Sequence, residues 1–379
     1  MRVLIFYASY GGGHLSAANS IKQYIEQTHP DYEIKMVDCM KFINTNFEKF
    51  TTDAYKIMAK EMPYAWGALY KLSDKGPIFH ISNFNNKIMS IKLYELFKNY
   101  NPDVVISTHP FSSQMTAWLK ATKKINCKLA NIMTDFAPQN QWLVGHKYMD
   151  YIFVSHEGMK KKIAKKGIDE NKIFATGIPL SSKFLQNFDK NEIKKSFNLD
   201  LTKKTILFFG GGEFGLGKDA TIKILKAFIN NLKDEYQMVL IAGRNQKMFE
   251  KFTTIVIKNQ IEDKIKVLSY TNQVPELMNI SDLVITKPGG LTTTESLASG
   301  LPIIIINPIP GQEEENANFL VNSGVGFWIK KPDKAEMYVS EILGDSQKLK
   351  RMKIKSKIMA KKNSTQNICD IIFNNYPPV

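Results

Sequence analysis

Short apolar runs alternate with helical patterns through the first half of the chain. Residues 3–7 form a continuous apolar run, and apolar residues then recur at Leu15, Ala18, Ile21 and Ile25, which is the spacing of an α-helix. This pattern predicts a buried strand, a tight turn and a helix. Further strands of the same kind are predicted at residues 33–38, 103–107, 129–133, 151–155 and 173–176. Strands that alternate with helices indicate a parallel sheet covered by helices.

The alternation pauses and then starts again in the second half. Residues 179–204 are polar and helix-prone, and the apolar run 205–209 that follows them ends in three glycines. Apolar, β-branched runs then predict strands at residues 238–242, 266–269, 283–286 and 303–306. We therefore expect two similar doubly wound α/β domains, with a ligand cleft between the carboxyl ends of their strands.

A long insertion separates the second and third strands of the first domain. Residues 40–101 are too many for one crossover helix, and they interleave aromatic residues with lysines. Aromatic rings with snorkelling lysines suit a membrane interface. The alternative is a pair of amphipathic helices packed on the first domain, and both can hold for opposite faces. The aromatic residues are Phe42, Phe47, Phe50, Tyr55, Tyr64, Trp66, Tyr70, Phe79 and Phe84.

The composition narrows the class of partner. The chain has 379 residues, enough for two domains with their own cores, and a formal net charge of +15. A surface this basic attracts anionic lipid, nucleic acid or phosphorylated metabolites, although solubility alone is the plainer explanation. Part of the excess lies at residues 348–362, which include eight basic residues.

Cysteine usage and hydropathy indicate the compartment. Cys39, Cys127 and Cys369 are far apart and odd in number, which argues against a disulfide framework or a zinc site and fits a reducing cytoplasm. The first apolar run is too short for a signal peptide, and no later run approaches the roughly 20 residues that span a bilayer. We therefore do not expect an integral membrane protein.

Three glycines and a histidine, residues 11–14, follow the first predicted strand. Glycine suits the tight turn, and the start of the next helix offers backbone amides to an oxygen-rich ligand. His14 places a titratable base beside those amides. Such a turn can also serve only to let a helix pack closely. The similar glycines at 210–212 strengthen the interpretation as a binding site.

Two other motifs are incomplete. Residues 212–219 nearly match the phosphate loop of nucleotide hydrolases, but Asp219 stands where a magnesium-binding hydroxyl residue is required. Such a loop can still cradle a diphosphate. His156-Glu157 begins a zinc-protease pattern that Lys160 ends. Because no Asp-x-Asp pair occurs, a divalent metal has no obvious ligands, and we expect no metal site.

The segment 286–295 carries the strongest signal. A strand end, two glycines, three threonines and a helix start make an anion site of backbone amides and hydroxyls. Glu295, one turn into the helix, is placed to reach ribose hydroxyls, and Glu315 with Asn316 to reach those of a sugar. Each residue alone is equally typical of a helix cap. Together, at the strand ends of one domain, they favour a nucleotide-sugar site.

The spacing of these motifs resembles one known family over almost the whole chain, the monogalactosyldiacylglycerol synthase and processive diacylglycerol glucosyltransferase family, which is related to the MurG enzymes. The resemblance implies a GT-B fold, in which two Rossmann-like domains face each other across a cleft. The acceptor domain would be 1–185, joined by a helix at about 360–379, and the nucleotide-sugar domain 186–359. The motifs lie at residues 11–14, 108–110, 134–136, 177–179, 210–212, 243–245, 287–290 and 310–313.

This family implies inverting transfer of glucose or galactose from a UDP-sugar to diacylglycerol, forming glycosyl-diacylglycerol. The expected partners are the UDP-sugar, diacylglycerol and an anionic membrane surface, without nucleic acid, metal or a further cofactor. The expected location is the cytoplasm, peripheral on the inner face of the cell membrane. The residues do not distinguish glucose from galactose, nor do they give the number of sugars added.

The resemblance also assigns roles to residues. His14 would deprotonate the acceptor hydroxyl, and Asp135 would assist or orient it. Gly289, Gly290 and Thr292 would hold the diphosphate. The implied donor-binding residues are Gly12, Gly13, Gly211, Gly212, Arg244, Tyr270, Thr271, Gly289, Gly290, Thr292, Glu295, Gln312, Glu315 and Asn316. The implied acceptor or membrane residues are Phe42, Tyr64, Trp66, Tyr70, His109 and Trp142.

One departure from the family and three alternatives remain. The family often has a histidine three residues after the Thr-Asp-Phe triplet, where this chain has Gln139, so that histidine's role is in doubt here. The alternatives are an N-acetylglucosamine transferase acting on an undecaprenyl-linked wall precursor, a nucleotide-sugar epimerase of the same architecture, and a nucleotide-sugar sensor without activity. The aromatic insertion fits the diacylglycerol branch better than the wall-precursor branch.

Overall fold

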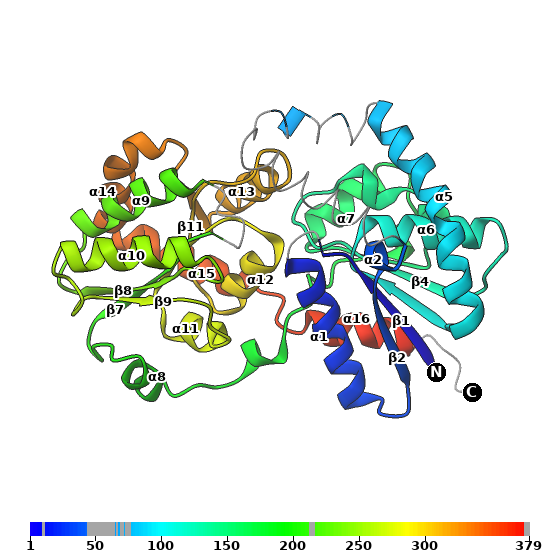
Figure 1. Cartoon of the computed structure of the whole chain (residues 1–379), viewed down its shortest axis with the longest axis horizontal. Helices are drawn as coiled ribbons and strands as arrows, with labels where there is room; N and C mark the ends of the chain where they lie inside the picture. Colours follow the sequence, from blue (N-terminus) through cyan, green and yellow to red (C-terminus); the bar gives the residue numbers. More distant parts are fainter. Residues whose placement is uncertain are drawn as a thin grey trace. The chain divides into compact units, whose positions relative to one another are not determined.

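The computed structural model describes residues 1–9, 12–43, 65, 67–68, 72, 77–211 and 217–374 (Figure 1). These residues belong to two compact units. The first unit takes the N-terminal part of the chain up to Ser182 and the segment from Lys361 onward, and the second is Lys183–Ala360. Of the described helices, none is both long and apolar enough to cross a membrane.

The first unit is built on a six-stranded parallel sheet with the order β2-β1-β3-β4-β5-β6. In β1, Leu4 and Phe6 pack on one face and Val3 and Ile5 on the other, since successive side chains of a strand alternate. Both faces are buried, which explains the continuous apolar run. The six predicted strands are confirmed as β1 (Arg2–Tyr7), β2 (Glu33–Asp38), β3 (Val104–Ser107), β4 (Lys128–Ile132), β5 (Tyr151–Phe153) and β6 (Ile173–Phe174).

Helices cover both faces of this first sheet. On one face, α1 packs beside the last described helix, α16, through Ile21, Ile25, Ile368 and Ile372. Helices α5 and α6 pack against each other and belong to the core of the other face. The helices are α1 (Gly12–Thr28), α2 (Cys39–Ile43), α5 (Pro77–Tyr100), α6 (Pro110–Ala121), α7 (Glu157–Ala164) and α16 (Ser364–Phe373).

The second unit repeats this architecture with the strand order β12-β11-β10-β7-β8-β9, again all parallel. The five predicted strands are confirmed, and the short edge strand β12, which begins with a glycine, was not predicted. The strands are β7 (Lys204–Phe209), β8 (Tyr236–Ile241), β9 (Ile265–Leu268), β10 (Leu283–Thr286), β11 (Ile303–Ile305) and β12 (Gly326–Trp328). The helices are α8 (Lys190–Ser196), α9 (Lys218–Asn230), α10 (Gln246–Lys258), α11 (Val274–Ile280), α12 (Gly290–Ala298), α13 (Gln312–Asn322), α14 (Ala335–Gly344) and α15 (Ser346–Met359).

Much of the insertion between β2 and β3 lies outside the described residues, including Tyr64, Trp66 and Tyr70. Its described ends are helical. Met40 of α2 and Leu93 of α5 are buried in the core of the first unit, so these ends pack as amphipathic helices on the domain, as the alternative interpretation expected.

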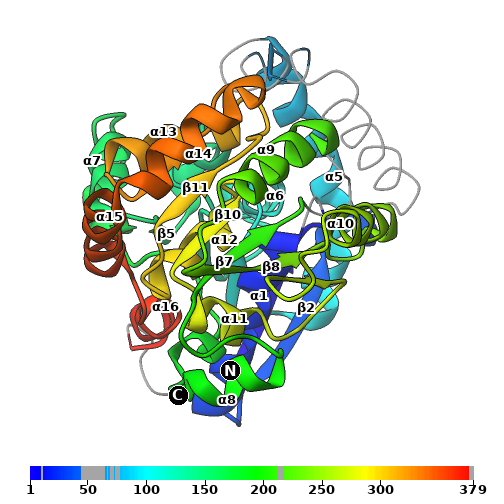
Figure 2. The same ribbon diagram turned by 90° about the vertical axis from the view of Figure 1, so that its left-hand side faces the viewer.

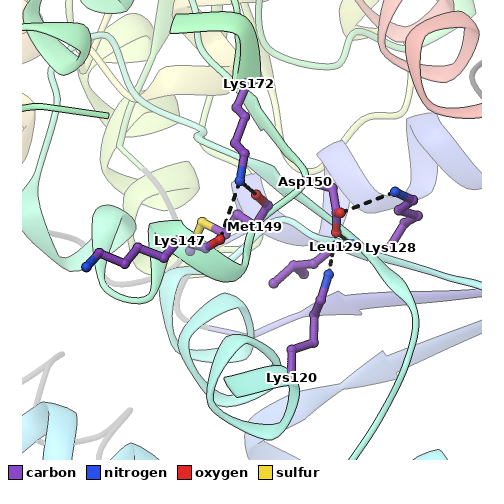
Figure 3. Close-up of polar contacts among 7 residues, drawn as sticks. All are labelled: Lys120, Lys128, Leu129, Lys147, Met149, Asp150 and Lys172. Carbon is purple, nitrogen blue, oxygen red and sulfur yellow. Dashed lines mark hydrogen bonds and ion pairs between the residues drawn. The ribbon is translucent and has the colours of Figure 1, made fainter. Parts of the chain in front are cut away.

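Asp150 ties the amino-terminal ends of β4 and β5 together (Figure 3). Its carboxylate accepts hydrogen bonds from Lys120 and from the Leu129 amide, the latter at 2.8 Å, and lies 3.5 Å from the Lys128 ammonium. Nearby, Lys172 donates to the Met149 carbonyl at 3.1 Å. Burial alone would raise the pKa of Asp150, but the hydrogen bonds from Lys120 and Leu129 and the two lysine charges outweigh it and lower that pKa.

We expect Asp150→Asn to lower the free energy of unfolding by about 2 kcal/mol at neutral pH, because a hydrogen bond to a charged group contributes about that much. A carboxyl with a lowered pKa stabilises the fold above its unfolded-state pKa, and this contribution is lost as the pH falls through the folded-state value. Urea unfolding of the two proteins should therefore differ at neutral pH and converge in acid. Asp234→Asn, which removes a surface pair with Lys264, is the control and should change little.

Candidate functional site

His14 lies in the first turn of α1, directly after the glycine turn that follows β1. Its Nδ1 is 2.6 Å from the Thr108 carbonyl oxygen and 3.2 Å from the Thr134 hydroxyl. A carbonyl oxygen can only accept, so Nδ1 carries the proton and donates it. The Thr108 hydroxyl donates in return to the His14 carbonyl at 2.9 Å. In the neutral ring, Nε2 therefore keeps a free lone pair.

His109 and His14 lie edge to face, with ring centroids 4.7 Å apart. His109 caps helix α6, and its Nδ1 accepts a hydrogen bond from the Phe111 amide at 3.3 Å. Burial lowers the pKa of His14 to about 4, against the hydrogen bond to Thr108. Burial, with the charge of His14, also lowers the pKa of His109. Both rings are therefore neutral at physiological pH, which is the state in which His14 can act as a base.

Trp142 closes one side of this histidine pair. It is 1% exposed, belongs to the core of the first unit, and its ring lies 6.2 Å from that of His14. The Asn131 amide donates to the Trp142 carbonyl at 3.0 Å and fixes this stretch of chain. The predicted acceptor residues His109 and Trp142 are thus brought together with His14. Phe42 is 45% exposed on α2.

Asp135 follows β4 and is 2% exposed. The Gln139 amide donates to its carboxylate at 3.4 Å, so the residue that replaces the family's usual histidine contacts the predicted assisting carboxylate. The next residue, Phe136, accepts a hydrogen bond at its carbonyl from His156 Nε2, at 3.0 Å. His156 Nδ1 caps α7 by accepting from the Met159 amide. His156 is therefore a structural residue of this loop, a role that the sequence did not indicate.

In the second unit, Gly289 and Gly290 begin helix α12 after β10. Among the described residues, no side chain caps this N-terminus, and its first amides have no partner within the helix, so they can serve an anion. Gly289 and Gly290 are both partly exposed, and the Glu313 carboxylate lies 3.8 Å from the position that a Cβ on Gly289 would take. Lys287, which sequence reasoning did not assign, immediately precedes the loop. Burial lowers its pKa and the charge of Glu313 opposes this shift.

Glu295 lies one turn into α12, and its side chain is only partly exposed. Within the described part of the chain, no hydrogen bond or ion pair reaches its carboxylate, and burial raises its pKa to about 8. A desolvated carboxyl without a partner is costly to keep, and such groups cluster at functional sites. The two adjacent hydroxyls of a ribose are donors that would satisfy it. Thr292, in the first turn of the same helix, is partly exposed.

The loop after β11 is held by acidic side chains of α13. Glu313 accepts from the Ile309 amide at 2.7 Å, and Glu314 accepts from the Gly311 amide at 3.2 Å. Asn316 is fully buried and donates to the Pro288 carbonyl at 3.1 Å. This hydrogen bond helps to position the loop at residues 287–290 that leads into α12. The predicted contact of Asn316 with a sugar stays a prediction. Gln312 is partly exposed and Glu315 is exposed.

The remaining predicted donor residues follow β7, β8 and β9 in the second unit and β1 in the first. The Arg244 guanidinium lies over the Tyr270 ring, 4.8 Å from its centroid, and Tyr270 is 60% exposed. The Thr271 hydroxyl accepts from the Gln273 amide at 3.0 Å. Gly211 has a positive φ of 87°, which favours glycine. Gly212 lies outside the described residues, whereas Gly12 is exposed and Gly13 partly exposed at the start of α1.

Among the described residues, no group of three histidine, cysteine or acidic side chains could hold a metal ion. The second unit offers a helix N-terminus for an anion, and a carboxyl, that of Glu295, which no described residue pairs with. The first unit offers a neutral histidine with a free Nε2.

Two family models together cover most of the chain. Monogalactosyldiacylglycerol (MGDG) synthase matches residues 14–180, and glycosyl transferases group 1 matches residues 189–359. The processive diacylglycerol beta-glucosyltransferase of Bacillus subtilis is 30% identical over 98% of this chain and 94% of its own length. The chain belongs to this diacylglycerol glycosyltransferase family. The protein of the same name from Bacillus pumilus is also 30% identical, with the same coverage.

Solved structures confirm the GT-B fold of this glycosyltransferase. Acinetobacter baumannii MurG superposes with a TM-score of 0.67 at 15% identity, covering 98% of this chain and 99% of its own. Staphylococcus aureus MnaA, solved with UDP, gives 0.63 at 14% identity, covering 98% and 95%. At these identities the likeness concerns the fold alone. The wall-precursor transferase and the epimerase, which were the alternatives from the sequence, are therefore supported only as relatives in fold.

We expect Glu295→Gln to weaken UDP binding to this glycosyltransferase by about tenfold above pH 8, where the wild-type carboxyl is ionised, because the substitution removes a charge-assisted acceptor. In the wild type, the Glu295 carboxyl is protonated below its raised pKa, so UDP affinity should rise as the pH increases through about 8. In the variant, that rise should disappear. Isothermal titration calorimetry across this pH range measures both effects.

Glu262→Gln, at an exposed position of the same unit, is the control and should bind UDP as the wild type does. Equal UDP affinity of wild type and Glu295→Gln at every pH would contradict the assigned contact.

Proposed function

We propose that this glycosyltransferase moves glucose from a UDP-sugar to diacylglycerol at a membrane surface, with inversion at the anomeric carbon and with His14 as the base. The observation that carries the proposal is the hydrogen bond from His14 Nδ1 to the Thr108 carbonyl, which leaves Nε2 as the basic nitrogen. The names of the relatives in Bacillus support glucose. The MGDG synthase model keeps galactose as the second candidate.

The reaction balances with the groups present. His14 Nε2 takes the proton of the acceptor hydroxyl as its oxygen bonds to the anomeric carbon, and the bond from that carbon to the β-phosphate oxygen breaks. UDP departs with the electron pair, and the amides at the start of α12 stabilise its diphosphate. Glu295 holds the ribose. The protein supplies this charge stabilisation through its helix N-terminus, so the proposed mechanism uses no metal.

We infer that the protein lies peripherally on the inner face of the cell membrane, and the surface of the first unit supports contact with a membrane. Ile88 and Ile91 of α5 are 53% and 59% exposed. Next to them, Trp118 of α6 is 37% exposed and has the Lys87 ammonium 4.5 Å from its ring centroid. An exposed aromatic residue with a lysine, beside exposed isoleucines, suits the headgroup layer of a bilayer.

The donor and acceptor are tested by UDP release. We expect release from UDP-glucose that depends on diacylglycerol in the vesicles, with glucosyl-diacylglycerol identified by mass, because the acceptor hydroxyl is the nucleophile. UDP-galactose in place of UDP-glucose tests the second sugar. Tight UDP-glucose binding without diacylglycerol-dependent release would refute the proposed acceptor.

We expect His14→Ala to lower kcat about a thousandfold while the KM for the UDP-sugar changes little, because general base catalysis contributes roughly a hundredfold to ten-thousandfold. The wild-type rate should persist at pH 6, where a histidine with an ordinary pKa would be largely protonated, since burial lowers the pKa of His14 to about 4. Steady-state kinetics over a pH series measures both. His146→Asn is the control outside the site and should retain the wild-type rate. Retention of kcat in His14→Ala would exclude His14 as the base.

A further inference from the structure

Helix α15 in the second unit presents an amphipathic face to solvent. Its residues Ile354 and Ile358 are 52% and 77% exposed and, being four apart, lie one above the other on the helix. At 100° per residue, exposed basic residues flank this apolar stripe on both sides. They are Lys350 and Lys357 on one side and Arg351 and Lys355 on the other.

The opposite face of α15 fixes this orientation. Met352 is buried in the core of the second unit, and the buried Ser356 hydroxyl donates to the Leu301 carbonyl at 2.9 Å. The helix packs on α12 and α14 (Figure 2). The two isoleucines therefore cannot turn inward without breaking these contacts.

A groove of about 440 Å³ runs between α15 and the edge strand β12. Its floor includes Phe327 and Trp328, and each ring has a lysine ammonium over it. The Lys348 Nζ is 4.3 Å from the centroid of Phe327, and the Lys330 Nζ is 4.9 Å from that of Trp328. Arg351 and Lys355, which flank the isoleucine stripe, also line this groove, and none of the described residues that line it is acidic.

The basic charge of the groove is only partly neutralised. Lys348 pairs with Glu341 at 2.8 Å, and Arg351 lies 3.9 Å from Asp345. Within the described residues, Lys330 and Lys355 have no carboxylate partner. The surface therefore combines an apolar stripe with an excess of positive charge beside it.

We propose that α15 and this groove dock the second unit on an anionic lipid bilayer, with Ile354 and Ile358 in the headgroup boundary and a phospholipid phosphate in the groove. Cations that flank an apolar stripe are typical of helices that lie in the membrane interface, because their charges reach the headgroups while the apolar side chains leave water. A second copy of this chain fits poorly, since it would bring more positive charge to the same surface. Nucleic acid would leave the isoleucines in water.

The proposal deepens the proposed function, since diacylglycerol is a bilayer lipid. It adds a contact on the unit that carries the donor site, separate from the exposed isoleucines of α5. The binding test below contains neither donor nor diacylglycerol, so its result does not depend on whether the proposed reaction is correct.

The test is sedimentation of the full chain with phosphatidylcholine vesicles, with and without phosphatidylglycerol. Each basic residue near an anionic surface strengthens binding about fivefold. The triple variant Lys350→Gln, Arg351→Gln, Lys355→Gln should therefore lower the partition coefficient on anionic vesicles about a hundredfold. The double variant Ile354→Ser, Ile358→Ser should lower it at least tenfold.

The matched control is α10 of the same unit, which carries three lysines and the 56% exposed Ile257. Two control variants should bind vesicles nearly as the wild type does. One combines Lys247→Gln, Lys251→Gln and Lys258→Gln, and the other carries Ile257→Ser alone. Equal losses in the α10 and α15 variants would show a general charge effect and overturn the proposal. Wild-type partition in the α15 variants would also overturn it.

Two further outcomes would assign the surface to another occupant. Calorimetry measures whether soluble glycerol 3-phosphate binds the groove as tightly as anionic vesicles do. If it does, the groove is a site for a soluble anion. Dimerisation of the wild type, abolished by the isoleucine variant in analytical ultracentrifugation, would make it a contact between copies. The α15 variants that lose vesicle binding should keep the circular dichroism spectrum of the wild type. They should also transfer sugar to detergent-dispersed diacylglycerol at the wild-type rate.

Discussion

In a parallel sheet every strand ends at the same edge, so the loops that follow the strands lie together there. The site of each unit depends on this constraint. In the first unit, the segments after β1, β3 and β4 bring His14, Thr108 and Thr134 into hydrogen-bond distance across about 120 residues of sequence. In the second, the same constraint sets Asn316 beneath Pro288. The buried apolar strands hold these loops in place. The geometry of the polar groups therefore depends on the stability of the two sheets.

The polar groups at these edges are arranged so that some hydrogen bonds are complete and others are left open. His109 and His156 each use one ring nitrogen to cap a helix, and the Asn316 amide donates to the Pro288 carbonyl. Within the part of the chain that the structure describes, His14 Nε2, the first amides of α12 and the Glu295 carboxyl have no such hydrogen bond. An unsatisfied polar group lowers stability, and a ligand that completes it recovers that free energy as binding.

The strands could be predicted because continuous apolar runs between glycines have few other interpretations. The strand β12 was missed because three residues that begin with Gly326 carry no periodic signal. The family resemblance named His14 as the base and His109 and Trp142 as acceptor residues, and the structure adds that their rings lie close together. The proton position on His14 could not be predicted, because it depends on a carbonyl 94 residues away. Residue type also suggested that Asn316 faces a ligand, whereas only packing shows that its amide is turned to Pro288.

Helix α16 has a consequence for how the chain acquires its fold during synthesis. The described residues of the second unit form one segment, Lys183–Ala360, so all of its described strands and helices are synthesised before α16. One face of the first sheet, by contrast, has α1 and α16 as neighbours, and Ile368 and Ile372 complete its core. The first unit therefore begins to form earliest and is finished last. Its exposed apolar face must wait, during translation, for the end of the described chain.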